Sequence, residues 1–275
     1  MTKKIYQSEV DFSKAPLENY SYFVSMKEEL ASANVNVVTT NIDIEDFKNW
    51  LEEFPNIDKQ YQASKDVYIE KCLEHYLSYK LLDFKTTDVF MDVAASGSQY
   101  ANELYYSKKV KQTYLLDLSY PEGINGIKIG ANAGDMKIPD NFIDKMGMHC
   151  AYECFEGEAD IRFLKEASRV LKANGKFIIT PLYLDKVYYN CTSDRCNQDK
   201  IKFDKEAVKV WRNDSYQVPF SRHYSPASFY ERIIKNMPKN ISYTLFFYEN
   251  LPELMRYFEG QRIYCYFLLY GEKND

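Results

Sequence analysis

Residues 88–102 read DVFMDVAASGSQYAN, and this stretch decides the fold that the sequence predicts. Residues 89–93 form a short apolar run that ends at a cluster of small side chains, residues 94–98. Such a run is typical of a buried parallel strand. The small residues allow a sharp turn into the helix-compatible segment 99–109, and they let a ligand approach the backbone N–H groups. The stretch therefore predicts a strand, a ligand-binding turn and a helix, with an ordinary strand-to-helix turn as the alternative.

Length and composition indicate an ordinary globular protein. The chain has 275 residues, which suits one large α/β domain or one domain with additions. Its hydrophobic content of 45% supports a sizeable core. The net charge of −5 argues against broad electrostatic binding to nucleic acid. No apolar run approaches the ~20 residues that cross a bilayer, and no signal-peptide core follows the N-terminus. We therefore expect no nucleic-acid and no membrane partner.

The cysteines point to a reducing compartment. The chain is too large to need disulfides, so we expect reduced thiols and a cytoplasmic protein. The six cysteines are Cys72, Cys150, Cys154, Cys191, Cys196 and Cys265. Four of them could form a zinc site on paper together with His149 and His223, but the Cys-x₂-Cys spacing typical of such sites is missing. We expect no metal, and the sequence leaves the oligomeric state open.

Helices precede the first strand, and strands alternate with helices after it. Helical spacing occurs in residues 17–33, in a segment that begins after Asn41 or Asp43 and ends before Pro55, and in residues 61–82. Strands are predicted at 89–93, 112–118, 127–131, 143–150, 176–182, 241–248 and 262–270, with helices at 159–171 and 225–237. This alternation indicates a parallel sheet with right-handed crossovers. We expect a helical N-terminal extension over residues 1–86 and an α/β domain over residues 87–275.

One long segment, residues 183–223, has no convincing period and is rich in Tyr, Asp, Asn and Lys. A connection of this length inside a compact domain is usually a functional lid or an insertion. It follows the fifth strand, whose carboxyl end faces the same crevice as residues 94–98. We therefore expect a lid over a substrate site.

The motifs, taken in order, resemble those of the class I S-adenosylmethionine-dependent methyltransferases, in particular the small-molecule branch called type 11. The resemblance covers roughly residues 89–184. It rests on the run Asp92 to Ser98, on Asp117, on Asn132-Ala133, on Ile138-Pro139 with residues 140–144, and on the helical residues 163–172 followed by Asn174-Gly175. It implies a Rossmann-like fold with a mostly parallel seven-stranded sheet, helices on both faces and an antiparallel last strand.

The same resemblance implies that S-adenosyl-L-methionine is the cofactor. The residues it assigns to the cofactor site are Asp92, Ala94, Ser96, Gly97, Asp117, Leu118, Asn132 and Ala133. Backbone amides of residues 94–98 would approach the methionine portion, and Asn132 and Ala133 would face the adenine. Asp117 would accept hydrogen bonds from both ribose hydroxyls, a task that suits two carboxylate oxygens. A turn residue at the end of a strand is the alternative for Asp117.

Three positions depart from the family pattern. Ala94 and Ser96 replace glycines of the family, and Asn132 stands where an aspartate is common. An alanine at position 94 fits only if the turn avoids a positive φ there. The same residues argue against a nicotinamide cofactor, because its G-x-G-x-x-G motif would place glycines at positions 94, 96 and 99.

Methyl transfer is an in-line displacement, so the protein mainly positions the acceptor and removes its proton. The catalytic candidates are His149, Glu153 and His223, and the substrate-contact candidates are Tyr152, Tyr183 and Arg222. A histidine titrates near neutrality and could serve as the base. A guanidinium could grip a phosphate or carboxylate. The alternatives are a structural role for His149, a surface position for Arg222 and core packing for the tyrosines.

The sequence thus predicts an enzyme that transfers a methyl group from S-adenosylmethionine to a small polar acceptor. The polar, tyrosine-rich segment 183–223 suggests a sugar or glycan precursor as that acceptor. A non-catalytic binding or scaffold protein with the same fold is the alternative, and the missing glycines agree with it.

Overall fold

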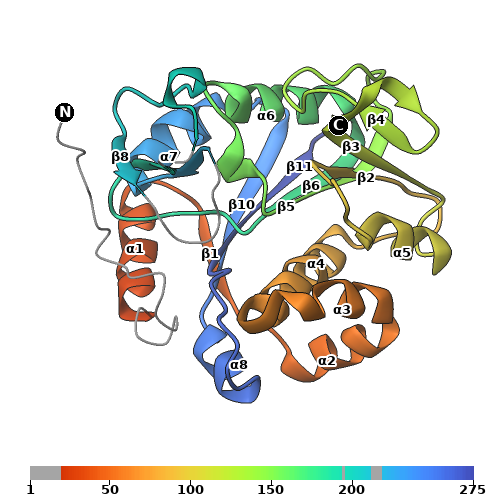
Figure 1. Cartoon of the computed structure of the whole chain (residues 1–275), viewed down its shortest axis with the longest axis horizontal. Coiled ribbons are helices and arrows are strands. Elements are labelled where there is room, and N and C mark those ends of the chain that lie inside the picture. Colours follow the sequence, from red (N-terminus) through yellow and green to blue (C-terminus); the bar gives the residue numbers. More distant parts are fainter. Residues whose placement is uncertain (1–19, 194–195, 212–218) are drawn as a thin grey trace.

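The structure is a computed structural model that describes residues 20–193, 196–211 and 219–275. An eight-stranded sheet runs through the middle of the molecule (Figure 1). In spatial order its strands are β1 (Val37–Thr40), β10 (Ile241–Tyr248), β11 (Phe267–Lys273), β6 (Leu171–Thr180), β5 (Ile143–His149), β2 (Val89–Val93), β3 (Gln112–Asn125) and β4 (Lys128–Gly130). Strand β11 is antiparallel to both neighbours, whereas β6, β5, β2 and β3 run parallel.

This sheet confirms the predicted class I methyltransferase fold. When the strands from β2 onward are numbered in chain order within this sheet, their spatial order from β4 to β10 is 3-2-1-4-5-7-6, and the seventh strand is the antiparallel one. The chain winds outward in both directions from β2 and β5. In open α/β sheets the ligand crevice lies at the carboxyl ends of the strands where the winding reverses.

The predicted number of seven strands is wrong, because β1 adds an eighth. Residues 37–40 read VVTT, and each of these β-branched residues suits a strand. The strand lies at the edge of the sheet parallel to β10, with Val37 opposite Leu245 and Thr40 opposite Tyr248. The N-terminal extension is therefore not purely helical, and it contributes to the main sheet.

Helices cover both faces of the sheet. In Figure 1, α4 (Tyr68–Leu82) and α5 (Tyr100–Tyr106) lie on one side, and α6 (Ala159–Val170) and α7 (Pro226–Arg232) lie on the other. The remaining helices are α1 (Tyr20–Ser32), α2 (Ile44–Glu53), α3 (Pro55–Tyr61) and α8 (Leu251–Tyr257). Residues 17–19 of the first predicted helix lie outside the described residues. Between the two capping candidates the structure selects Asp43, whose carboxylate accepts from the backbone N–H of Asp46.

Several predicted elements differ in their bounds, and the contacts of two of them give the physical reason. The helix predicted at 61–82 is interrupted, because Lys65 takes a φ of 53° in a 3-10 turn between α3 and α4. The last strand begins at Phe267 rather than at residue 262. The backbone N–H groups of Tyr264 and Cys265 donate to the carboxylate of Glu70 instead of to a neighbouring strand.

The segment 183–223 is more regular than its sequence suggests. Its described residues form a three-stranded sheet in the order β8 (Val208–Trp211), β7 (Tyr189–Thr192) and β9 (Ser221–His223), while residues 194–195 and 212–218 lie outside the described residues. Strand β7 is parallel to β8 and antiparallel to β9. Strands this short leave no clear period in a sequence.

Candidate functional site

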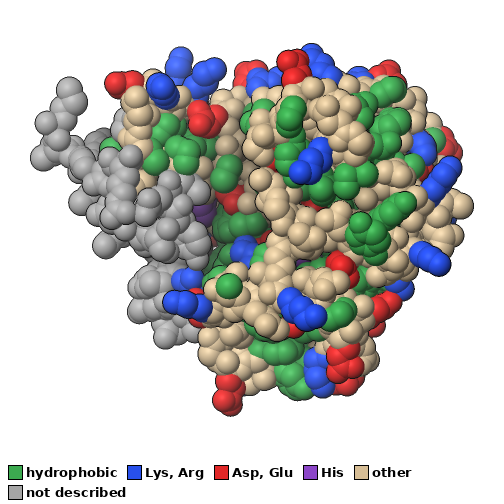
Figure 2. Space-filling view, turned by 45° about the vertical axis from the view of Figure 1, so that its right-hand side comes forward, with side chains coloured by type: hydrophobic (Ala, Val, Ile, Leu, Met, Phe, Trp, Pro, Cys, Tyr) green, Lys and Arg blue, Asp and Glu red, His purple; other side chains and the backbone are tan. Residues whose placement is uncertain are grey.

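The central parallel strands end at one edge of the sheet. Val93 of β2 pairs with Leu116 on one side and with Met148 on the other, and Met148 pairs with Ile179 of β6. The residues that follow these strands therefore gather at a common edge. Figure 2 shows that this side of the molecule is hollowed near its middle, where acidic, basic and histidine atoms are seen below the surrounding surface.

The turn after β2 exposes its backbone. Gly97 has a φ of 80°, and a Cβ added there would meet no heavy atom within 4 Å. Ala94 has a φ of 56°. The condition under which an alanine fits easily at position 94 is therefore not met, and this alanine holds a conformation that glycine adopts more easily. The glycine of the family pattern would suit this position, and the alanine adopts it at a cost.

Asp117 lies where the first half of β3 ends. Its Oδ2 accepts from the backbone N–H of Ser96 at 3.1 Å, and its Oδ1 accepts from that of Ser119 at 2.8 Å. The carboxylate thus joins the end of β3 to the turn after β2. Each oxygen retains a second lone pair for a ligand hydroxyl. Leu118 is 75% exposed beside it, so an apolar surface adjoins the carboxylate.

Asn132 and Ala133 follow β4, the strand next to the one that carries Asp117. Asn132 is exposed, and its Oδ1 accepts from the backbone N–H of Gly134 at 2.7 Å. Ala133 is buried. The amide oxygen of Asn132 still has one lone pair with which to accept from a ligand amine.

Two residues near the turn carried no signal in the sequence analysis. The first is Gln60 of α3, whose Nε2 donates to the Gly97 carbonyl at 3.0 Å and whose Oε1 accepts from the Gln99 N–H at 3.0 Å. One side chain of the N-terminal extension therefore holds the turn on both sides. A long-range contact of this kind has no local pattern that could have revealed it.

The second is Tyr120, which the sequence analysis left unassigned. Burial raises the pKa of its phenol, the carboxylates of Asp117 and Asp92 raise it further, and a hydrogen bond from the Gly97 backbone lowers it. These influences place the phenol beside the turn and beside Asp117. Its ring also lies 5.0 Å from the ammonium of Lys128.

His149 ends β5 and contacts Asp92 of β2. Its Nδ1 lies 3.1 Å from Asp92 Oδ1, and both side chains are buried. A Cβ on Gly147 would come within 2.7 Å of His149 Cε1, so the glycine makes room for the imidazole. The His75 ring packs 4.4 Å from the His149 ring.

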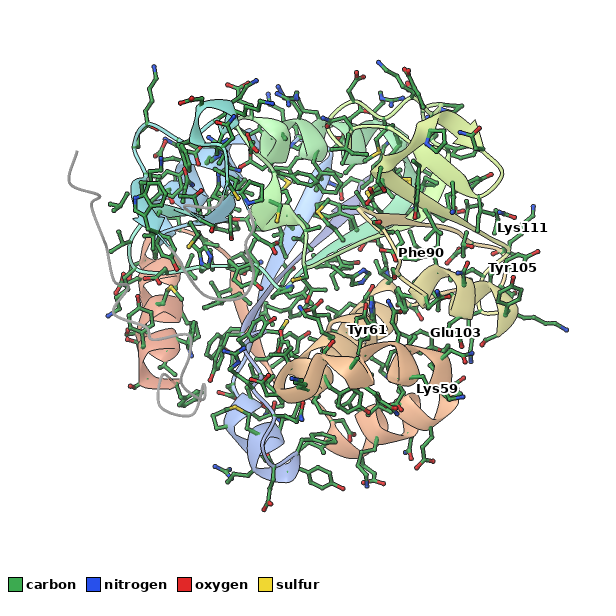
Figure 3. All side chains as sticks on the ribbon, in the orientation of Figure 1. Lys59, Tyr61, Phe90, Glu103, Tyr105 and Lys111 are labelled. Atoms are coloured by element: carbon green, nitrogen blue, oxygen red, sulfur yellow. The ribbon has the colours of Figure 1, made fainter. Side chains whose placement is uncertain are left out.

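His75 is tied to the N-terminal extension. Its Nε2 lies 2.9 Å from the Tyr61 hydroxyl, and burial lowers its pKa well below the ordinary histidine value. Figure 3 labels Tyr61 at the end of α3 and Phe90 on β2, with the helices of the extension on one side and the sheet on the other. The neutral imidazole therefore belongs to the boundary between the two.

A second group of polar side chains follows β5. Cys150 Sγ lies 3.1 Å from Lys71 Nζ, 3.6 Å from Glu153 Oε1 and 3.7 Å from the Tyr183 hydroxyl. Lys71 Nζ also forms an ion pair with Glu74 Oε1 at 2.6 Å. Lys71 and Glu74 come from α4, so the N-terminal extension supplies two of the five side chains in this group.

Burial changes the acidity of this group. It raises the pKa of Glu153 to about 7 and that of Cys150 to about 12. A carboxyl with a pKa near 7 can take up or release a proton at neutral pH. The thiol stays protonated under the same conditions. The structure therefore brings the candidates His149, Glu153 and Tyr183 together at the edge that also carries Asp92 and Asp117.

Three other candidates lie elsewhere. Tyr152 is buried, and its hydroxyl donates to the Asp160 carbonyl at 3.2 Å. His223 is buried in β9 and stacks on Tyr189, with Nδ1 3.0 Å from the Tyr189 hydroxyl. The ring centre of His223 lies 5.0 Å from that of Tyr183, so His223 packs against a residue of the candidate site.

Arg222 has a packing role rather than the surface position given as its alternative. Its side chain is 0% exposed and lies between the carboxylates of Asp160 and Asp204, at 3.0 and 2.8 Å. It also donates to the carbonyls of Phe155 and Gly157. With its donors directed at these groups, the guanidinium fastens β9 to the loop after β5 and does not reach a ligand.

Within residues 20–193, 196–211 and 219–275, no three His, Cys, Asp or Glu side chains are arranged to hold a metal ion. Cys72, Cys150, Cys154 and Cys265 are free thiols, and Cys72 and Cys265 are buried. In the same described parts, no helix has the length and apolar character needed to span a membrane.

The chain matches no protein-family model and no curated protein. It is similar to many solved structures, several of which are named as methyltransferases. The 1,6-didemethyltoxoflavin-N1-methyltransferase of Burkholderia thailandensis, with bound 1,6-didemethyltoxoflavin and S-adenosylhomocysteine, is 11% identical over 86% of this chain and 94% of that one, with a TM-score of 0.47. An unconfirmed S-adenosylmethionine-dependent methyltransferase of Listeria monocytogenes is 16% identical over 75% and 99%, with a TM-score of 0.47. The YcgJ protein of Bacillus subtilis is 13% identical over 74% and 99%, with a TM-score of 0.43.

Proposed function

We propose that the chain is an S-adenosylmethionine-dependent methyltransferase that acts on a small polar acceptor in the cytoplasm. One observation carries the proposal. The carboxyl edge of a class I methyltransferase sheet holds Asp117 beside an open turn and, two strands away, a buried carboxyl, Glu153, with a pKa of about 7. Asp117 and the open turn suit a nucleoside, and Glu153 suits the removal of a proton from an acceptor.

The residues at this edge fit the cofactor. The open space at Gly97 leaves room for a ligand against the backbone of the turn, and Asp117 keeps lone pairs for two ribose hydroxyls. The exposed Leu118 would cover one face of an adenine ring, and Asn132 and Ala133 would meet its edge. Asp92 Oδ2 is buried without a hydrogen-bond partner, so a donor on the ligand would satisfy it.

Bound there, S-adenosylmethionine would supply an electrophilic methyl group. The chain's own residues would then position the acceptor and accept its proton. Glu153 is the proposed proton acceptor, and Asp92 orients the His149 imidazole through its Nδ1 contact. Tyr183 would close the acceptor side, since its hydroxyl lies next to Cys150.

The segment 183–223 remains a proposed lid. Its first residue, Tyr183, is at the acceptor end of the site, and Arg222 fastens its last strand to the loop after β5. A lid in this place would exclude water from the reacting groups. A sugar or glycan precursor stays a prediction for the acceptor.

Calorimetric titration of the full chain with S-adenosylmethionine and S-adenosylhomocysteine tests the proposal. We expect saturable heat with both ligands and an increase in the thermal midpoint. No heat and no thermal shift at millimolar ligand would contradict it. The alternative, a non-catalytic binding protein, would bind the cofactor but show no proton uptake by Glu153 when an acceptor is present.

A further inference from the structure

The acceptor end of the proposed site is rich in carboxyl groups. Glu70 and Glu74 from α4 and Glu153 after β5 are all buried, and the Lys71 ammonium pairs with Glu74 and acts electrostatically on Glu70 and Glu153. Three carboxyls around one ammonium leave negative charge without compensation whenever more than one of them is ionised. Such a site disfavours an anionic acceptor.

Two of these carboxyls have an oxygen without a partner. Glu70 Oε2 accepts from the backbone N–H groups of Tyr264 and Cys265, but Glu70 Oε1 has no hydrogen-bond partner. Glu153 Oε1 lies near Cys150, but Glu153 Oε2 has no partner either. Buried polar atoms are nearly always paired, so these oxygens indicate a missing donor.

Aromatic rings adjoin the carboxyls. The ring centres of Tyr183 and Tyr264 lie 6.1 Å apart, and the Lys71 ammonium lies 5.5 Å from the Tyr264 ring. Lys71 shows how this environment treats a cation. Burial lowers its pKa, but Glu74 and its neighbours outweigh burial, and the pKa ends well above the ordinary lysine value. The surroundings therefore stabilise a buried ammonium group.

We propose that the methyl acceptor carries a protonatable amine, which binds as an ammonium between Glu153, Glu70 and the rings of Tyr183 and Tyr264. The inference rests on the proposed methyltransferase function and names its acceptor class. An ammonium offers three N–H donors and a positive charge, whereas a hydroxyl offers one O–H donor and no charge. Arg222, the guanidinium that could have selected a phosphate, is fully occupied by Asp160 and Asp204.

The transfer step then balances. One ammonium proton passes to the Glu153 carboxylate and frees the nitrogen lone pair. That lone pair forms the nitrogen–carbon bond to the methyl group, and the carbon–sulfur bond breaks with its electron pair left on sulfur. The product is a methylated ammonium and a neutral thioether, and the carboxyl holds the first proton.

The test compares three probes of one shape: cyclohexylamine, cyclohexanol and cyclohexanecarboxylate. Each is titrated calorimetrically into the full chain at a pH of about 8.5, where the amine is protonated and Glu153 is ionised. We expect the amine to bind about tenfold tighter than the alcohol, and the carboxylate to bind weakest. Glu153→Gln and Glu70→Gln should each reduce this preference, whereas Glu158→Gln, at an exposed position, should keep it.

Equal binding of amine and alcohol would overturn the inference, as would an amine preference that survives in both variants. Titration of the same samples with S-adenosylhomocysteine separates the two proposals. If that ligand binds but the amine has no preference, the acceptor class is wrong and the methyltransferase function stands. If the amine preference is present and S-adenosylhomocysteine does not bind, the methyltransferase function fails, and with it the assignment of the amine as a methyl acceptor.

Discussion

His149 Nδ1 lies 3.1 Å from Asp92 Oδ1, so the residue that ends β5 is joined to the strand that leads into the cofactor turn. The contact depends on Gly147, because a Cβ there would collide with the imidazole. The proposed cofactor end and the proposed acceptor end of the site therefore share one buried polar contact. A substitution of either residue should disturb the structure of both ends, because buried polar contacts are costly to break.

Asp117→Ala should weaken the binding of S-adenosylhomocysteine more than tenfold. The variant would lose two hydrogen bonds to the ribose, each worth roughly 1.5–3 kcal/mol because one partner is charged. Calorimetry measures the loss. Asp135→Ala is the matched control, since that carboxylate is exposed and pairs with exposed Lys137. Unchanged affinity in the Asp117 variant would place the cofactor elsewhere.

Gln60→Ala should weaken cofactor binding without unfolding the chain. It removes the two hydrogen bonds that hold Gly97 and Gln99, so the turn must be ordered again when the ligand binds. The neighbouring Gln62→Ala removes an exposed contact to Asp58 and should leave affinity unchanged. Equal affinities in both variants would show that the extension does not support the turn.

Ala94→Gly should raise the free energy of unfolding by about 0.5 kcal/mol. The αL conformation costs an alanine about 1–2 kcal/mol, and the entropy that glycine adds to the unfolded chain returns about half of that gain. Ala95→Gly, at a buried position outside the αL region, should lower stability by about 1 kcal/mol. Denaturant unfolding measures both, and a loss of stability in both would contradict the strained turn.

The rate of methyl transfer should rise with pH through about 7 and then level off. Glu153 must lose its proton before it can accept one from the acceptor, and burial raises its pKa to about 7. In Glu153→Gln the rise should disappear and the rate should fall by about 100-fold or more. Measurement of kcat/KM from pH 5 to 9 in both proteins tests this prediction. A Glu153→Gln profile that keeps the same inflection would assign it to another group.

The contribution of Glu70 and Glu153 to stability should fall as pH rises from about 4.5 to about 8. Burial raises the folded-state pKa of Glu70 to about 8 and that of Glu153 to about 7, so the folded chain holds protons that the unfolded chain has already lost. The stabilisation is complete below the unfolded value and is lost as pH passes the folded values. Urea unfolding of the wild type and of Glu70→Gln compares the slopes, and equal slopes would exclude Glu70 as a source.

The sequence predicts correctly those helices and strands whose own residues show a clear hydrophobic pattern. The apolar run at 89–93 and the amphipathic helix at 159–171 appear as β2 and α6, and Asp117 stands at the edge where its motif placed it. The edge strand at Val37–Thr40 could not be found this way. Its hydrogen-bonding partner is β10, near the other end of the chain, and four residues carry no usable period.

The acceptor end shows the same limit. Helical spacing predicted a helix that includes Lys71 and Glu74, but it could not show that Lys71, paired with Glu74, also meets Cys150 beyond β5. Arg222 was placed with the substrate because guanidinium groups often bind anions. Its burial between Asp160 and Asp204 depends on tertiary packing, which the sequence does not display.

The parallel pairing of β1 with β10 also sets an order of events during synthesis. Val37 leaves the ribosome long before Leu245, so β1 has no strand to pair with until almost the whole chain has emerged. Closing so long a loop costs entropy that only later contacts repay. The nascent chain must therefore carry β1 unpaired until the last strands arrive, whereas α4 can already pack on β5 and β6. Chaperone binding to nascent chains should consequently include the segment around β1 and end when β10 and β11 emerge.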